Sequence, residues 1–482
     1  MESLLELEEL VSSVSGKVLS LNDNAPKCYF TSVQTDSRNV SKNTLFVPLI
    51  GEFQNGHKYI PGAIEKGASV IFINNDEYSQ NTGKYNQLIN DNNDVLFIAV
   101  ENTLHGLQNA AECYVSKKCK NMTRISITGS SGKTTTKEMM VSVCKVHFGE
   151  NNVAYTKGNF NSETGLPLTA FTIRGDEKCC VLEMGMNRVN EIGEISKILK
   201  SQYGIITNIG TAHIGILGSR ENIAREKRKS LNYIPENGAA FVWDDDDLSD
   251  FCCENVSGKI VKFGKNIPEF ISGVKFIKDK GLFGSEFTID GNLVKLPLSG
   301  EYNYLNALAV IACAKTLGFK ADEIKAGLEN VSAVSGRMEV KEITLKNKKS
   351  FAVVKDCYNA NLESMSKVID FCNSLENVGK RFFVLADMKE LGAESEKAHR
   401  TIGKMINNNQ PDYTFLIGSE MEFAYDEINN KSNVFYYKGS SDISFDEIVS
   451  KICKVVEDKD VVLIKGSHSM ELEKLYAMFG EK

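Results

Sequence analysis

The sequence lacks the features that mark nucleic-acid-binding, membrane-spanning or exported proteins. Its 56 Lys and Arg residues are outnumbered by 63 Asp and Glu residues, the net charge is −7, and no basic stripe occurs. No apolar run approaches the roughly 20 residues that a membrane-spanning helix needs. Residues 1–10 are acidic and amphipathic, without the positive segment that begins a signal peptide. We therefore expect a cytoplasmic protein with no membrane span and no nucleic-acid partner.

The cysteines also lack the spacing of a metal site. There are 12 of them, and the adjacent pairs Cys179-Cys180 and Cys252-Cys253 do not resemble the ligand sets of zinc sites. With no export signal, we expect reduced thiols. Composition is that of a globular protein, with 42% hydrophobic and 25% charged residues, and 482 residues suggest about three domains. Nothing favours an obligate oligomer, so we expect a monomer.

One stretch combines a β-prone segment, a glycine-containing turn and the start of a helix. It follows residues 124–127, precedes the helical pattern of 137–141, and reads Thr128-Gly129-Ser130-Ser131-Gly132-Lys133-Thr134-Thr135-Thr136. Glycines let backbone N–H groups face a phosphate, and a helix start adds partial positive charge. Lys133 would neutralise the β- and γ-phosphates of a nucleotide, and Thr134 would offer a hydroxyl to Mg²⁺. Ile127 stands where the longer form of this loop has glycine, so this is the shorter GxxGKT form. The alternative is a simple turn before a surface helix.

The order of β-prone and helical segments predicts three α/β domains, at residues 1–102, 103–331 and 332–482. Alternation of strand and helix in the second domain predicts a mostly parallel sheet, with ligands at the carboxyl ends of its strands. The polar stretch 74–94 is expected to be a loop with some helix. The region 283–298 alternates and contains Asp290-Gly291, which predicts a hairpin. Strands are expected at 44–49, 68–73, 95–100, 153–156, 179–183, 204–208, 239–243, 351–354, 382–386, 413–417 and 461–464.

Several polar residues of the central region are candidates for a metal and phosphate site. Glu183 closes a predicted strand and could hold Mg²⁺, although a lone exposed Glu is the alternative. His213 also follows a strand, where an isolated His is more often structural. Lys227 lies on a charged helix, for which a solvated face is the default. The carboxylates of 244–247 are read as a solvated loop rather than a metal site. In the first domain, Asp36-Ser37-Arg38 is either a phosphate or sugar contact or a plain turn.

A resemblance to the Mur ligase family joins these residues. The motifs TGSSGKTTTKE (128–138), YTKGNFNSETGLPLT (155–169), LEMGMNRVNEIGEI (182–195), ITNIGTAHIGILGSRENIAREK (206–227) and GEYNYLNALA (300–309) resemble successive motifs of that family. DCYNAN (356–361) and LADMKELG (385–392) with His399 resemble motifs of its D-alanyl-D-alanine-adding members. DSRNVSKNTLFVPLIGEFQNGHKYI (36–60) resembles the UDP-sugar-binding domain that these members share with the ligases that add the third residue of the peptide. The resemblance covers almost the whole chain. It implies an N-terminal UDP-binding domain, a central phosphate-loop domain and a C-terminal Rossmann-like domain.

The resemblance also implies a reaction and roles for residues. The reaction is ATP-dependent addition of D-alanyl-D-alanine to UDP-N-acetylmuramoyl-tripeptide through an acyl phosphate, in cell-wall precursor synthesis. Thr134 and Glu183 would bind one Mg²⁺; His213 and Lys227 would serve a second, with Lys227 carbamylated. The catalytic set would be Lys133, Glu183, His213 and Lys227. ATP would contact Gly129, Ser130, Ser131, Gly132, Lys133, Thr134, Thr135, Asn303, Asn306, Arg337 and Asp356, and the other substrates Ser37, Arg38, Asn159, Asn359 and Asn361.

The chain departs from the family pattern at six positions. These departures leave two alternatives open: a ligase of this type acting on another carboxylate and amine, or a nucleotide-binding homologue without ligase activity. The third residue of the tripeptide is not determined by the sequence. The departures are Lys355 for an acidic residue, Leu362 for proline, His468 for arginine, Tyr302 for histidine, Lys229 for glutamate and Thr164 for an aliphatic residue.

Overall fold

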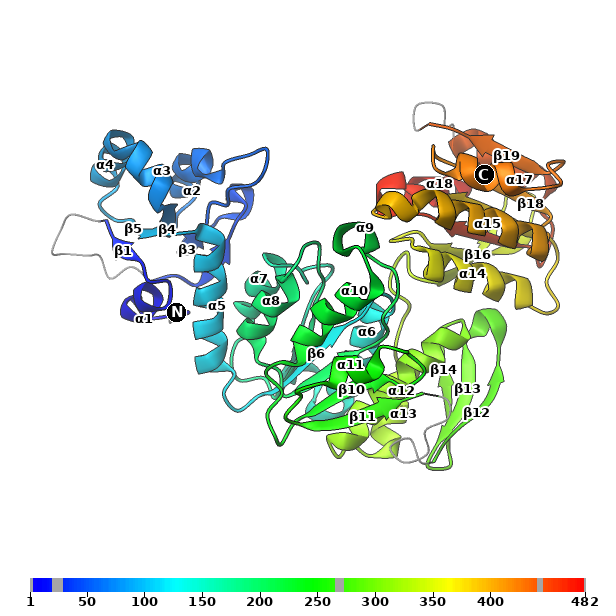
Figure 1. Cartoon of the computed structure of the whole chain (residues 1–482), viewed down its shortest axis with the longest axis horizontal. Helices are drawn as coiled ribbons and strands as arrows, with labels where there is room; N and C mark the ends of the chain where they lie inside the picture. The colour runs from blue at the N-terminus through cyan, green and yellow to red at the C-terminus, as the bar shows by residue number, and fades with distance from the viewer. Residues whose placement is uncertain (1–2, 20–28, 265–272, 440–444, 481–482) are drawn as a thin grey trace.

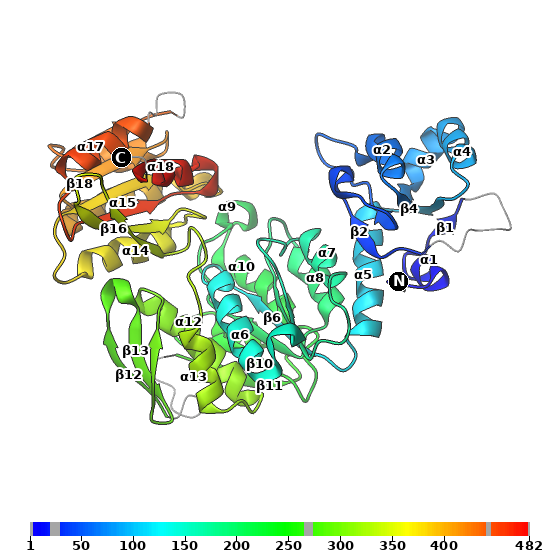
Figure 2. The ribbon, with the colours of Figure 1, turned by 180° about the vertical axis from the view of Figure 1, so that it is seen from behind.

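Three α/β bodies follow one another along the chain in the computed structural model, which describes residues 3–19, 29–264, 273–439 and 445–480. In Figure 1 the N-terminal body lies at one end, the C-terminal body at the other, and the central body between them. The view from behind in Figure 2 shows the same order, with the long helix α5 (Thr103–Lys118) between the first two bodies. The three-domain α/β architecture expected from the sequence is therefore confirmed. The boundaries at 102/103 and 331/332 stay predictions.

The N-terminal body is built on a five-stranded sheet with the order β1-β5-β4-β3-β2, in which only the β1 pairing is antiparallel. Apolar residues of β4 and β5 are buried on both faces, which is typical of a parallel sheet covered by helices. Its strands are β1 (Lys17–Val18), β2 (Ser32–Gln34), β3 (Thr44–Phe46), β4 (Ala68–Asn74) and β5 (Leu96–Val100). Its helices are α1 (Leu7–Ser13), α2 (Ile60–Glu65), α3 (Asn75–Gln80) and α4 (Thr82–Asp91).

The polar stretch 74–94 contains more helix than its composition predicts. The side chain of Asn74 caps α3 by accepting the backbone N–H groups of Asp76 and Glu77. Tyr85 and Ile89, four residues apart on α4, are buried against the sheet. The apolar face of α4 is narrow. The many Asn residues around it make the composition resemble that of a loop, so the composition did not predict the helix.

The central body carries a six-stranded parallel sheet with the order β11-β10-β9-β6-β8-β7. The strand before the phosphate loop, β6, lies in the middle, so both neighbouring strand ends converge on the loop. The strands are β6 (Thr123–Thr128), β7 (Val153–Tyr155), β8 (Cys179–Glu183), β9 (Tyr203–Ile206), β10 (Ala239–Trp243) and β11 (Lys259–Phe263). The helices are α6 (Lys133–Phe148), α7 (Gly165–Ala170), α8 (Glu191–Leu199), α9 (Ile214–Leu217), α10 (Arg220–Lys227), α11 (Ser249–Cys253), α12 (Glu301–Thr316) and α13 (Ala321–Glu329).

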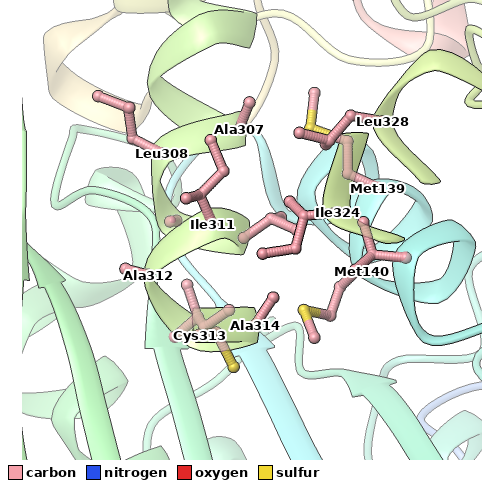
Figure 3. Packing of buried hydrophobic residues seen from close by; sticks show 14 of the residues in the cluster. Met139, Met140, Ala307, Leu308, Ile311, Ala312, Cys313, Ala314, Ile324 and Leu328 are labelled. Carbon is pink, nitrogen blue, oxygen red and sulfur yellow. The ribbon is translucent and has the colours of Figure 1, made fainter. Parts of the chain in front are cut away.

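One face of this sheet is covered by α6, α12 and α13. Figure 3 shows Met139 and Met140 of α6 pointing toward Ile311 of α12 and Ile324 of α13. Helix α12 is apolar on nearly all sides and sits in the interior of the body. This packing fixes α6, and with it the phosphate loop, on the sheet.

The predicted hairpin is present as β13 (Ser285–Ile289) and β14 (Asn292–Leu296), joined at Asp290-Gly291. A third strand, β12 (Val274–Asp279), pairs with β13 and was not predicted. Its side chains are mostly exposed, so it lacks the alternation that reveals a half-buried strand.

The C-terminal body contains a six-stranded sheet with the order β15-β16-β20-β17-β18-β19, parallel except for the β15–β16 pair. Across all described parts of the chain, no helix is long and apolar enough to cross a membrane. The strands are β15 (Glu339–Thr344), β16 (Ser350–Asp356), β17 (Arg381–Ala386), β18 (Tyr413–Ile417), β19 (Val434–Tyr437) and β20 (Val461–Lys465). The helices are α14 (Leu362–Ser374), α15 (Ser395–Asn409), α16 (Met421–Glu427), α17 (Phe445–Val455) and α18 (Leu472–Phe479).

Candidate active site

The phosphate loop joins the end of β6 to the start of α6, as its sequence predicts. Gly129 and Gly132 have φ values of 152° and 78°, in the region that favours glycine. A Cβ atom on Gly129 would lie 1.8 Å from Oγ1 of Thr207, and one on Gly132 would lie 2.6 Å from Oδ1 of Asn306. Glycine is therefore required at both positions, because the backbone has a positive φ and neighbouring side chains leave no room for a Cβ atom. The loop backbone leads directly into the N-terminus of α6, and a helix N-terminus attracts anions.

Two lysine side chains converge beneath this loop. Nζ of Lys133 and Nζ of Lys227 donate to the same carbonyl oxygen of Gly129, at 2.8 and 2.9 Å. Burial lowers the pKa of Lys133 to about 8, although Glu183 opposes the shift. Burial, together with the charge of Lys133, lowers the pKa of Lys227 well below its usual value. The default expectation of a solvated Lys227 is wrong, because its side chain is only 1% exposed.

Glu183 and Thr134 form the predicted pair at the ends of β8 and α6. Oγ1 of Thr134 donates to one carboxylate oxygen of Glu183 at 2.8 Å. Nδ2 of Asn161, which was not singled out in the sequence, donates to the other at 2.7 Å. Glu183 is completely buried, so the alternative of a lone exposed Glu is wrong. A fixed carboxylate and hydroxyl oxygen beside a phosphate loop fit the oxygen preference of Mg²⁺.

No cluster of three His, Cys, Asp or Glu side chains that could hold a metal occurs among the described residues. Mg²⁺ commonly binds through one or two protein oxygens together with phosphates and water, so this geometry suits it. His213, the other predicted metal residue, has its Nδ1 atom 3.1 Å from a carboxylate oxygen of Glu390 in the C-terminal body. That contact lowers the pKa of Glu390.

Residues at the end of β9 hold the phosphate loop in place. Oγ1 of Thr207 donates to the carbonyl oxygen of Ser131 at 2.6 Å, and Oδ1 of Asn208 accepts the Ser131 N–H at 3.0 Å. The sequence predicts that polar strand ends converge on this loop, but these two residues were not named as site residues. Their position directly after a buried β segment was the available signal.

The C-terminal body supplies the opposite wall. A carboxylate oxygen of Asp356, at the end of β16, accepts from Lys465 at 2.6 Å, and the other accepts the Met338 N–H at 3.1 Å. The guanidinium of Arg337 stacks on the ring of Tyr358 at 4.1 Å. Lys465 and Tyr358 were not predicted, although Tyr358 lies in the DCYNAN motif and Lys465 directly follows the predicted strand 461–464. A fixed carboxylate and a stacked guanidinium form a polar wall facing the phosphate loop.

A cavity of about 410 Å³ lies between the central and C-terminal bodies. Trp243 and Phe263, at the ends of β10 and β11, line one part of it and were not predicted. Gly129, Thr134 and Lys227 are absent from its lining, and Lys227 lies beneath the loop. The predicted residues that line it are Ser130, Ser131, Gly132, Lys133, Thr135, Asn159, Glu183, His213, Asn303, Asn306, Arg337, Asp356, Asn359 and Asn361.

Ser37 and Arg38 lie in the N-terminal body and do not line this cavity. The guanidinium of Arg38 is highly exposed and makes an ion pair with Asp36 at 2.7 Å, which holds the pKa of Asp36 at about 2. The three residues form a turn in which Asp36 caps a short 3₁₀ helix. The structure therefore does not bring these two residues together with the ATP residues.

The departures from the family pattern have different surroundings. Tyr302 and His468 line the cavity. Lys355 does not line the cavity. Its ammonium group pairs with the carboxylate of Glu339 at 3.0 Å, so the two side chains link neighbouring strands of the C-terminal sheet. Lys229 pairs with Glu226 at 2.7 Å. Leu362 packs at the edge of the C-terminal core.

Two of the carboxylates at 244–247 have structural partners that the sequence did not indicate. Asp246 accepts the backbone N–H of Ile209 at 2.7 Å, and Asp247 pairs with Arg220 at 2.6 Å. They form part of a loop beside the site.

Comparison with known proteins agrees with this arrangement. Residues 127–314 match the Mur ligase middle domain, residues 336–468 the glutamate ligase domain of Mur ligases, and residues 29–114 the catalytic domain of the Mur ligase family. The UDP-N-acetylmuramoyl-tripeptide--D-alanyl-D-alanine ligase of Treponema pallidum is 34% identical, over 98% of each chain. The chain belongs to the Mur ligase family. The resemblance read from the motifs is thereby confirmed.

Solved structures of Mur ligases share the whole fold. A crystal structure of MurF from Acinetobacter baumannii has a TM-score of 0.83 at 26% identity and covers 98% of each chain. MurF from Thermotoga maritima in complex with ADP has a TM-score of 0.75 at 27% identity, and the match covers 93% of this chain and 97% of that one.

Proposed function

We propose that the chain is an ATP-dependent amide ligase that adds D-alanyl-D-alanine to UDP-N-acetylmuramoyl-tripeptide. The observation that carries the proposal is the buried Thr134–Glu183 pair beside Lys133 of the phosphate loop, where Glu183 and Lys133 line a cavity whose opposite wall comes from a second domain. The relatives that match over nearly the full length bear this activity in their names. The ADP bound to the Thermotoga protein supports ATP as the nucleotide.

The residues account for a transfer in two steps. An oxygen of the tripeptide carboxylate attacks the γ-phosphorus of ATP, and the bond between that phosphorus and the β,γ-bridging oxygen breaks. The products of this step are an acyl phosphate and ADP. Lys133 and the loop N–H groups neutralise charge on the transferring phosphoryl group. The amine of D-alanyl-D-alanine then attacks the acyl carbon, loses a proton, and displaces inorganic phosphate. Both the carboxylate and the triphosphate are anionic, so cations are the first requirement of this site.

Mg²⁺ would be held by Thr134 and Glu183, and when bound it supplies charge neutralisation to the phosphates. Asn161 orients the carboxylate for this role, since it fixes the oxygen that Thr134 does not contact. We place His213 and Lys227 at a second cation, with Lys227 as a carbamate. The buried environment that lowers the pKa of Lys227 favours the neutral amine, which is the form that reacts with CO₂.

The C-terminal body would keep water from the acyl phosphate. It contributes Arg337, Asp356 and Asn361 to the cavity, and a dry site prevents hydrolysis of a reactive intermediate. Asn303 and Asn306 are assigned to the nucleotide, and Asn159 and Asn359 to the other substrates.

The test is release of phosphate from Mg·ATP with the purified chain. UDP-N-acetylmuramoyl-tripeptide and D-alanyl-D-alanine are added separately and then together, and Lys133→Ala serves as the inactive control. We expect release only when both are present. No release with both present would contradict the proposal.

A second candidate is a ligase of this type with a different carboxylate and amine. Tyr302 and His468, two departures from the family pattern, line the cavity and favour it. A substrate screen in which only the cell-wall pair gives turnover would remove this candidate. A nucleotide-binding homologue without ligase activity requires ATP binding with no turnover on any acceptor.

A further inference from the structure

The segment 207–213, between β9 and α9, is bonded on one side to the phosphate loop. The N–H of Ser130 donates to the carbonyl oxygen of Asn208 at 3.0 Å. The N–H of Gly210 donates to Oγ of Ser130 at 2.8 Å. Movement of this segment would therefore move the phosphate loop with it.

The other side of the same segment is held by the C-terminal body. A carboxylate oxygen of Glu363, on α14, accepts the backbone N–H of Thr211 at 2.8 Å. Two residues further on, His213 faces Glu390 at 3.1 Å. Both views place α9, which follows this segment, on the side of the central body that faces the C-terminal body (Figures 1 and 2).

The Glu363 carboxylate lies directly against the backbone of Gly210, with no room for a side chain between them. A Cβ atom added to Gly210 would lie 2.0 Å from one carboxylate oxygen of Glu363 and 2.9 Å from the other. The three nearest atoms to that position all belong to Glu363, and the backbone of Gly210 is not in the left-handed region. An alanine at this position would therefore collide first with the Glu363 carboxylate.

We propose that Glu363 is a positioning residue that couples the C-terminal body to the phosphate loop. The path consists of two hydrogen bonds at adjacent residues: Glu363 to the Thr211 N–H, and the Gly210 N–H to Ser130. Docking of the C-terminal body orders the segment, and the segment fixes the loop N–H groups that receive the phosphates. The inference rests on the proposed function in taking this loop as the ATP site.

The first test compares Glu363→Ala, Glu363→Gln and Asp370→Ala. Loss of a hydrogen bond to a charged group should raise the KM for ATP by about 10-fold in Glu363→Ala, with a smaller change in kcat. The glutamine variant should retain most of the wild-type KM, because its amide oxygen still accepts the Thr211 N–H. Asp370 is an exposed carboxylate on the same helix, so its removal should change neither constant. A purely structural role would lower the active fraction, and hence kcat, without raising KM.

The second test uses the collision at Gly210. Gly210→Ala should raise the KM for ATP to a similar extent, because its methyl group displaces the Glu363 carboxylate. The double variant Gly210→Ala/Glu363→Ala should be no worse than Glu363→Ala, since the colliding group is gone. Additive losses in the double variant, or an unchanged KM in both single variants, would overturn the proposal.

Calorimetric titration with ADP separates this inference from the proposed function, since it needs no turnover. We expect the affinity for ADP to fall in Glu363→Ala and Gly210→Ala, and to be no lower in the double variant than in Glu363→Ala. If the wild type binds ADP and shows this pattern without ligating the cell-wall substrates, only the proposed function fails. If the wild type ligates them and the variants bind ADP as it does, only the coupling fails.

Discussion

The amino groups of Lys133 and Lys227 both donate to the carbonyl oxygen of Gly129. Two cationic side chains so close together suit a site that binds an anion. Lys227 is buried there and Lys133 is partly buried, and the pKa of each is lowered chiefly because removal from water disfavours the charged form. Bound phosphates would restore the preference of Lys133 for its charged form. Lys227 lies beneath the loop and outside the cavity lining, so its amine is the better candidate for modification.

Lys227→Ala should lower turnover by at least about 100-fold if its carbamate serves a cation at the site. A short carboxylic acid such as formate or acetate should restore part of the rate, because it supplies the missing anion in the space that the side chain leaves. Phosphate release measured with increasing acid checks this. Arg225→Ala, on the exposed face of the same helix, is the control and should need no rescue. An undiminished rate in Lys227→Ala would refute the role.

His57 provides a pH-dependent contribution to the stability of the N-terminal body. Its Nε2 atom accepts the Asn74 N–H at 3.0 Å and its Nδ1 atom lies 2.7 Å from Oδ1 of Asn55, so the neutral ring fits both partners. Burial lowers the pKa of His57 to about 4. Protonation then favours the unfolded chain, whose histidine has a pKa near 6.5.

The stability that His57 contributes should be complete above pH 6.5 and lost as the pH falls toward 4. The loss in free energy of unfolding should reach up to about 3 kcal/mol. Thermal midpoints of the wild type and His57→Gln between pH 8 and pH 4 measure it, and the variant should show the flatter profile. His105→Gln, at an exposed position, should retain the wild-type slope. Equal slopes in wild type and His57→Gln would contradict this assignment.

At the scale of elements, the sequence predicts best where a strand is buried and followed by polar residues. β8, β10 and β18 coincide with the segments expected, and Glu183 is found in the site because it ends β8. Strand β12 could not be predicted, because its exposed side chains follow no period of two. Helices α3 and α4 were underestimated because Asn-rich composition resembles a loop.

Contacts between residues that are distant in the sequence could not be predicted from the sequence either. Glu363 lies 152 residues from Thr211, and Asn161 lies 22 residues from Glu183, yet both pairs are bonded. Motif positions bring candidate residues to the same strand ends, but not the partners that orient them. The family resemblance implied roles for His213 and Lys227 without showing that Glu390 and Gly129 contact them here.

Lys355 illustrates how a departure from a family motif can be explained within one element. It stands opposite Glu339 in the register of β15 and β16, and the two side chains pair at 3.0 Å. Lys355 is 8% exposed at its side chain, so removal of its partner would leave a buried, unpaired charge.

Lys355→Glu should lower the free energy of unfolding by about 3 kcal/mol, since two carboxylates then face each other. The swap Glu339→Lys/Lys355→Glu should recover much of this loss, and urea unfolding measures both. Because Lys355 does not line the cavity, the folded fraction of the single variant should keep its KM for ATP. An equal loss in the single and swapped variants would show that the pair is not the cause.

For the whole molecule, the arrangement of three bodies separates the predicted UDP-contact residues from the cavity. The cavity lies between the central and C-terminal bodies, whereas Ser37 and Arg38 belong to the N-terminal body. In Figure 1 that body lies at the opposite end of the molecule from the C-terminal body. If Ser37 and Arg38 bind the UDP group of the substrate, as we propose, binding energy from that remote nucleotide would help to position the reacting carboxylate.

Arg38→Ala should therefore separate the two nucleotide sites. The exposed guanidinium is free to leave Asp36 for a diphosphate, and its loss should raise the KM for the UDP-linked substrate by roughly 10-fold. The affinity for ADP should stay within about two-fold of wild type, because Arg38 is remote from the cavity. Calorimetry with ADP and kinetics with the UDP-linked substrate measure the two effects, with Lys84→Ala on α4 as the control. A parallel loss of both affinities would mean that the N-terminal body acts on the ATP site itself, and an unchanged KM would place the UDP group elsewhere on that body.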